Sequence, residues 1–98
     1  MIDIKHNGKK YINVTADGYR ALGIPEEVYE VALLEKKWVS VRVKRDALIA
    51  ETDWTQTLDS PLSDGKKAEF LAYRQELRDI PQAYGDPDDV VWPEKPTI

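Results

Sequence analysis

The sequence predicts an α+β fold that is mostly helical, on the strength of three observations. Apolar and polar residues alternate on both sides of Asn7-Gly8, a pattern typical of a β-hairpin. A long stretch after Pro25 contains neither Gly nor Pro, and a second run of apolar residues at helical spacing follows residue 63, so two helices are expected. We therefore predict one domain over 1–98, with a β-hairpin and short helical turn (1–24), a helical hairpin with a DWTQ loop (25–80) and an extended tail (81–98).

Composition narrows the class of protein. The 98 residues are 42% hydrophobic and 33% charged, as in globular domains, and no apolar run is long enough for a membrane span or a secretory signal. The absence of cysteine excludes disulfides and thiolate chemistry. The net charge of −4 lies mainly in residues 53–98, which carry ten acidic and five basic side chains. Nucleic acid is not an expected partner, because its phosphates need clustered cations.

Two registers are open for the N-terminal hairpin. A two-residue Asn7-Gly8 turn would pair Ile4 with Tyr11 and place Ile12 on the opposite face. A three-residue loop that begins at His6 would pair Ile4 with Lys10 and Ile2 with Ile12, so that the even-numbered apolar residues share a face. We favour the three-residue loop, with Gly8 in a left-handed conformation.

The chain then enters its long helix. Thr15 is expected to cap a short helical turn over 16–22, which Gly23 closes. Pro25 suits the first position of the next helix, which we expect to run to about Thr52. Acidic residues come early in this segment and most basic residues late, as the helix dipole favours.

The long helix has two apolar stripes. The first is a candidate partner-binding stripe, formed by Val31, Leu34, Trp38, Val41 and Leu48. The second, more than a quarter-turn away, is formed by Val28, Ala32, Val39, Val43 and Ala50. One neighbour cannot cover both. Either the hairpin covers one stripe and the second helix the other, or a second copy of the chain or a client protein covers one of them.

The DWTQ string at 53–56 puts a tryptophan in a connecting loop. We expect Trp54 to fold inward as a wedge between the two helices. Ser63 or Asp64 is expected to cap the second helix. This helix is predicted to end near Asp79, because Pro81 disfavours helical geometry at the residue before it. One face of this helix is formed by Phe70, Tyr73, Leu77 and Ile80.

The tail contains Trp92 among Val90, Val91 and Pro93 and shows no periodicity, so an extended segment is expected. Two placements of Trp92 are open. It either packs within the chain or anchors another protein, as single aromatics on Pro-containing segments do.

Candidates for chemistry are few. The one histidine, His6, adjoins the hairpin turn without an orienting partner, and the acidic run at 86–89 lacks the spacing of a calcium loop. There is no glycine-rich phosphate loop and no nucleophile elbow. We expect no catalytic residues, no metal and no cofactor, and hence no enzyme.

Three ordered strings carry a resemblance to a known family: DWTQ (53–56), YRQELRDIP (73–81) and VVWPEKP (90–96), with RDALIAETDWTQ (45–56) leading into the first. Together they resemble the C-terminal module of the phage tail assembly chaperone family, and similar strings close some tail fibre assembly proteins. The resemblance covers about residues 45–96. Its motif positions are Asp53, Trp54, Tyr73, Arg74, Leu77, Pro81, Trp92 and Pro93.

The resemblance implies a non-enzymatic helper, encoded by a phage or prophage, that holds a tail or tail fibre protein in the bacterial cytoplasm until it assembles. Most of the motif positions would then be structural, with Arg74 paired to Asp53 or to a carbonyl of the tail. Further expectations are a possible homo-oligomer and no binding to nucleic acid or membrane. A small structural subunit that stays in the virion is the competing interpretation.

Overall fold

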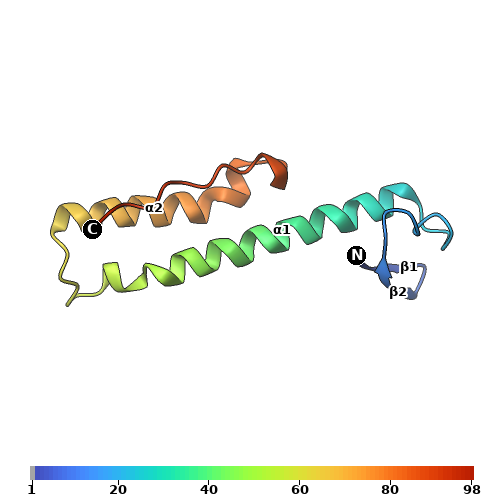
Figure 1. The fold of residues 1–98 in the computed structure, drawn as a ribbon, viewed down its shortest axis with the longest axis horizontal. Helices are drawn as coiled ribbons and strands as arrows, with labels where there is room; N and C mark the ends of the chain where they lie inside the picture. Colours follow the sequence, from blue (N-terminus) through green and yellow to red (C-terminus); the bar gives the residue numbers. More distant parts are fainter. Residues whose placement is uncertain (1) are drawn as a thin grey trace. The chain divides into compact units, whose positions relative to one another are not determined.

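The computed structural model describes residues 2–98 and confirms the predicted fold class. An antiparallel hairpin of β1 (Ile2–His6) and β2 (Lys9–Val14) is followed by two helices, α1 (Glu26–Glu51) and α2 (Asp64–Ala83) (Figure 1). The chain divides into two compact units, of which the first ends at Val39 and the second begins at Ser40. The start of α1, expected at Pro25, and its end, expected at Thr52, are each correct to within one residue.

The hairpin has the two-residue turn, and the favoured three-residue loop is wrong. Ile4 pairs with Tyr11 and His6 with Lys9, so only Asn7 and Gly8 lie in the turn. Both have positive φ, 51° and 77°. Consecutive left-handed residues form the turn whose twist matches that of the two strands. Local turn geometry therefore decided the register against the simple alternation of apolar residues.

A bulge in β2 then restores the apolar face. Ile2 pairs with Val14, one position out of step with the rest of the ladder, and Asn13 adopts a φ of 54°. The Asn13 backbone N–H donates to Asp3 Oδ1 at 3.0 Å, which holds the bulge. The extra residue turns Val14 to the buried side, whereas Ile12 points to solvent with 67% of its surface exposed. The predicted pairing of Ile2 with Ile12 is thus also wrong.

The first unit has its own apolar core. Its buried members come from the hairpin, the connection and the first turn of α1: Ile2, Ile4, Val14, Tyr19, Ile24 and Tyr29. The rings of Tyr19 and Tyr29 stack with centroids 4.5 Å apart. The connection over 15–23 is a series of turns rather than a helix, and Gly23 ends it with a φ of 76°. Stacking across this connection fixes where α1 leaves the hairpin.

We predict that Gly8→Ala lowers the free energy of unfolding by about 1–2 kcal/mol, because an L-residue in the left-handed region clashes with its own backbone. Urea unfolding followed by circular dichroism measures this. Gly85→Ala is the matched control, since Gly85 lacks positive φ and an added Cβ there meets open space. A loss of equal size in both variants would contradict the assignment of strain to the turn.

The second unit joins the end of α1 to α2 through a short 3-10 helix, η1 (Asp53–Gln56). Ser63 caps α2, its hydroxyl accepting from the Lys66 N–H at 3.2 Å. The predicted end of α2 at Asp79 is wrong, because the helix continues through Pro81 to Ala83. Pro81 removes only one backbone bond near the end of the helix, and the Tyr84 N–H still donates to the Ile80 carbonyl. Burial of Ile80 in the core outweighs the weak preference against helix before proline.

The predicted apolar face of α2 is the core of the second unit. Phe70, Tyr73, Leu77 and Ile80 are all buried. The tail beyond Ala83 is mostly extended, as expected, but contains a second 3-10 helix, η2 (Pro87–Asp89). Asp86 caps η2 by accepting from the Asp88 N–H at 2.9 Å, so part of the acidic run has a structural role.

Candidate functional site

The DWTQ segment is built differently from the prediction for Trp54. Trp54 is 41% exposed, so its expected place as a buried wedge is wrong. The buried residues are Thr52 and Thr55, at 1% and 0% exposure. A 3-10 helix has three residues per turn, which puts positions 52 and 55 on one side and 54 on another. Trp54 lies over the core from outside, with its ring 6.4 Å from that of Phe70.

The two buried threonines satisfy their own polar groups locally. Thr52 Oγ1 donates to the Ile49 carbonyl at 3.0 Å, and Thr55 Oγ1 donates to the Thr52 carbonyl at 2.6 Å. Gln56 Nε2 reaches across to the Lys67 carbonyl at 3.0 Å. These bonds tie the end of α1 to the start of α2. Thr52 and Thr55 are three residues apart, with Trp54 between them. This spacing was the sequence signal that could have identified the buried threonines.

Arg74 is the central polar residue of this unit. It is 7% exposed, and its Nη1 donates to the Ile49 carbonyl at 2.7 Å and to Thr52 Oγ1 at 3.0 Å. Its Nη2 pairs with Asp53 Oδ1 at 2.9 Å, which confirms one of the two predicted partners. The backbone contact is to α1 rather than to the tail. Nε is buried and has no hydrogen-bond partner among residues 2–98. One planar guanidinium thus closes the end of α1 against α2.

Other motif positions also lie in the scaffold. Leu77 is fully buried, and Tyr73 is buried beside it on α2. Burial raises the pKa of the Tyr73 phenol above its ordinary value of 10.0, with Lys95 lowering it and Glu51 raising it by smaller amounts. Pro81, Trp92 and Pro93 are half-buried.

Within the second unit, side-chain contacts attach the tail to α1 and α2. Lys44 Nζ lies 4.4 Å from the centroid of the Trp92 ring, a cation–π contact that gives Trp92 a partner within the chain. Lys66 Nζ donates to the Thr97 carbonyl at 2.8 Å, Tyr84 donates to the Val91 carbonyl, and Lys95 pairs with Glu51. Figure 1 shows the tail, in red, running back beside α2.

The apolar stripes of α1 are covered only in part. On the second stripe, Val28 and Ala32 pack against the hairpin core, whereas Val39 and Val43 are exposed. On the first stripe, Trp38, Val41 and Leu48 are half-buried, whereas Val31 and Leu34 are 57% and 42% exposed. One of the two interpretations was that the hairpin and the second helix cover both stripes. These two elements leave apolar side chains of both stripes in solvent.

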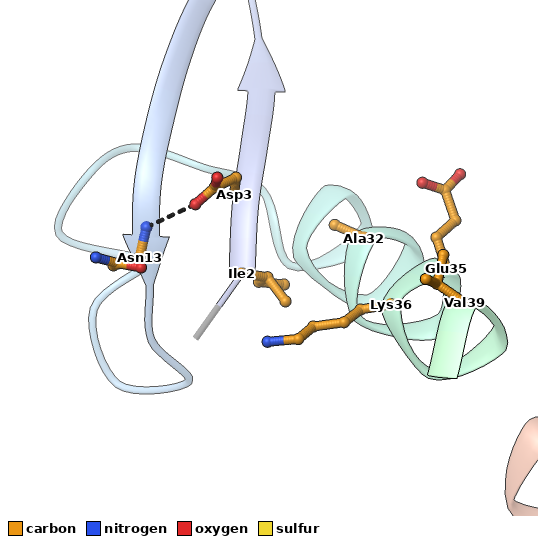
Figure 2. A pocket seen from close by; sticks show the side chains of 7 residues that line it. All are labelled: Ile2, Asp3, Asn13, Ala32, Glu35, Lys36 and Val39. Atoms are coloured by element: carbon orange, nitrogen blue, oxygen red, sulfur yellow. Dashed lines mark hydrogen bonds between the residues drawn. The ribbon is translucent and has the colours of Figure 1, made fainter. Parts of the chain in front are cut away.

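A pocket of about 480 Å³ lies between the hairpin and α1 within the first unit (Figure 2). It is lined by Ile2, Asp3, Asn13, Ala32, Glu35, Lys36 and Val39. Figure 2 shows that Glu35 points away from the strands, while the Asp3 carboxylate is engaged by the bulge. General acid–base chemistry needs a carboxylate aimed at a substrate position, and this pocket does not supply one.

Among residues 2–98, no group of three or more His, Cys, Asp or Glu side chains could hold a metal ion. No helix there is both long and apolar enough to cross a membrane. His6 ends β1 next to the turn, half-buried.

Comparison with known proteins identifies the family. The model of the phage tail assembly chaperone protein family matches residues 38–97, more than half of the chain. The fold is similar to the solution structure of a protein from Chromobacterium violaceum, with 30% identity, a TM-score of 0.57, and coverage of 97% of this chain and 96% of that one. No curated protein matches the chain. The matched segment contains the end of α1, η1, α2 and the tail with their joining contacts, and the chain belongs to the phage tail assembly chaperone protein family.

Proposed function

We propose that this protein is a non-enzymatic chaperone that holds a phage tail or tail fibre protein in the cytoplasm of the bacterial host until the tail is assembled. The family match over residues 38–97 is the observation that carries this proposal. Such a helper needs apolar surface to offer to a client and a charged exterior that keeps it dissolved.

Both requirements have counterparts in the structure. Apolar side chains are exposed along α1, at Val31, Leu34, Val39 and Val43, and in the tail, at Val91 and Ile98. The net charge of −4 favours solubility of the free protein. We propose that the client contacts the exposed part of the α1 stripe and the tail, while the buried motif residues hold these surfaces in place.

Deletion of the gene from the phage tests the proposal. We expect the deletion to leave heads intact and to abolish complete tails or their fibres in electron micrographs, with plasmid-encoded protein restoring them. Co-expression with the neighbouring tail genes should yield a co-purifying tail protein. Normal tails with normal fibres in the deletion strain would overturn the proposed function.

The competing interpretation is a small subunit retained in the tail. Mass spectrometry of purified virions separates the two, because a chaperone is released and a subunit stays. Stoichiometric peptides of this chain in finished virions would favour the subunit.

A further inference from the structure

We propose that one short surface of α1, the acidic-rimmed patch, binds a basic amphipathic helix of the client. The patch consists of Val31 and Leu34 with Glu27 and Glu30 beside them, and these four residues line a shallow pocket. The inference rests on the proposed function and adds the chemical class of the partner.

The apolar part of the patch has helical spacing. Val31 and Leu34 are three residues apart, so they form one ridge on a single face of α1, and more than two-fifths of each side chain is exposed. A ridge of this kind packs into the groove between side chains of a second helix. An extended strand would need an open sheet edge, and the patch offers none.

The charged part of the patch selects the partner. Glu27 and Glu30 lie one turn before Val31 and Leu34, and neither side-chain carboxylate forms a hydrogen bond or ion pair with another residue in 2–98. No Lys or Arg occurs in α1 between residues 26 and 35. An incoming helix with Lys or Arg beside its apolar residues would pair with these carboxylates, and an acidic helix would be repelled.

A second copy of this chain in parallel orientation does not fit the same surface. A two-fold contact between parallel helices centred on Val31 and Leu34 would bring four carboxylates together, two from each copy, without a base from that part of α1. A contact shifted toward the basic end of α1 would meet residues that are already occupied, since α2 is bonded there to Ile49 and the tail to Lys44. Charge therefore favours a basic client helix over a parallel pair of copies.

The patch spans about one helical turn, far below the area of a stable interface. Binding there is correspondingly weak and reversible, which suits a helper that must release its client.

Fluorescence anisotropy with two labelled synthetic peptides tests the proposal on the full chain. Both peptides are 18-residue amphipathic helices with leucine at heptad spacing, one with lysine and the other with glutamate at the flanking positions. We expect the lysine peptide to bind at least about tenfold more tightly than the glutamate peptide, because each carboxylate contributes a modest attraction or repulsion. Equal binding of the two peptides would overturn the proposal.

Charge reversal supplies the matched comparison. Glu27→Lys/Glu30→Lys should weaken binding of the lysine peptide about tenfold and strengthen that of the glutamate peptide. Asp59→Lys/Glu76→Lys makes the same change in net charge at exposed sites of the second unit and should leave both affinities unchanged. Equal weakening by the two double variants would show that overall acidity, not the patch, attracts the peptide.

The apolar contact has its own control. Val31→Ser/Leu34→Ser should also weaken binding of the lysine peptide about tenfold. Leu71→Ser, at an exposed leucine of α2, should leave that binding unchanged. Light scattering on the wild type and the variants tests whether a second copy of the chain occupies the patch. A dimer that forms in the wild type and is lost in the patch variants would overturn the proposal.

Tail assembly distinguishes failure of this inference from failure of the proposed function. If the wild-type gene restores tails and Glu27→Lys/Glu30→Lys restores them equally well, the patch inference fails while the chaperone function stands. If the deletion never affected tails, the proposed function fails, and the peptide measurements still decide what the patch binds.

Discussion

Replacing Leu77 with alanine is expected to lower the free energy of unfolding by about 3 kcal/mol, within the usual range for a buried leucine. Leu77 is fully buried on α2 in the core of the second unit, between Tyr73 and Ile80 on the same face. The truncation removes buried apolar surface and leaves a cavity that a short helical pair cannot easily collapse. Urea unfolding monitored by tryptophan fluorescence measures the loss, because Trp54 and Trp92 belong to this unit.

Leu71→Ala provides the matched control on the same helix. Leu71 is 52% exposed, so the same chemical change there should cost less than about 0.5 kcal/mol. The change in helix propensity is the same at both sites, so the difference between the two losses of unfolding free energy measures the effect of burial. Similar losses at Leu71 and Leu77 would mean that the face formed by Phe70, Tyr73, Leu77 and Ile80 is not the core.

Much of the fold followed from periodic patterns. The limits of α1, the cap at Ser63 and the buried face of α2 were all predictable, since each rests on residues close together in the sequence. The hairpin register was not, because a bulge at Asn13 compensates for the shorter turn. The alternation of apolar residues in the sequence does not reveal such an insertion. The end of α2 was missed for a related reason, as tertiary packing of Ile80 overrode the local effect of Pro81.

The candidate site was less predictable than the fold. The expected burial of Trp54 came from its size and apolarity, but in a 3-10 helix the inward positions belong to Thr52 and Thr55. The pairing of Arg74 with Asp53 was one of the two alternatives that the family motif suggested. The hydrogen bond of Arg74 to the Ile49 carbonyl was not predictable, because every residue has a backbone carbonyl and the sequence does not distinguish one from another.

The buried motif residues and the exposed apolar ridge of α1 lie in different parts of the chain. The motif residues Tyr73, Arg74 and Leu77 are buried, and they join the end of α1 to α2. The exposed ridge of Val31 and Leu34 lies before residue 38, where the family match begins. A motif that is mainly structural can accompany different contact surfaces, so under the proposed function the family motif and the client contact involve different residues.

Arg74→Ala is expected to lower the free energy of unfolding by about 3 kcal/mol and the melting temperature by more than about 10 °C. The variant leaves the Ile49 carbonyl and the Thr52 hydroxyl without their charged donor inside the unit. It also removes the alkyl stem that fills the space between α1 and α2. Thermal unfolding followed by circular dichroism gives the shift.

Two substitutions separate the parts of this effect. Asp53→Asn removes the ion pair but should cost less than about 1 kcal/mol, since the Asp53 side chain is 64% exposed and its attraction is screened by water. Arg74→Lys keeps the charge and most of the stem, yet one ammonium group cannot reproduce the two-nitrogen contact, so a loss of about 1–2 kcal/mol is expected. Thus the order Arg74→Ala, Arg74→Lys, Asp53→Asn, from most to least damaging, identifies the buried bonds to α1 as the source of stability. Equal losses in Asp53→Asn and Arg74→Ala would instead assign the stability to the surface ion pair, and unchanged melting of Arg74→Lys would show that a charge alone suffices.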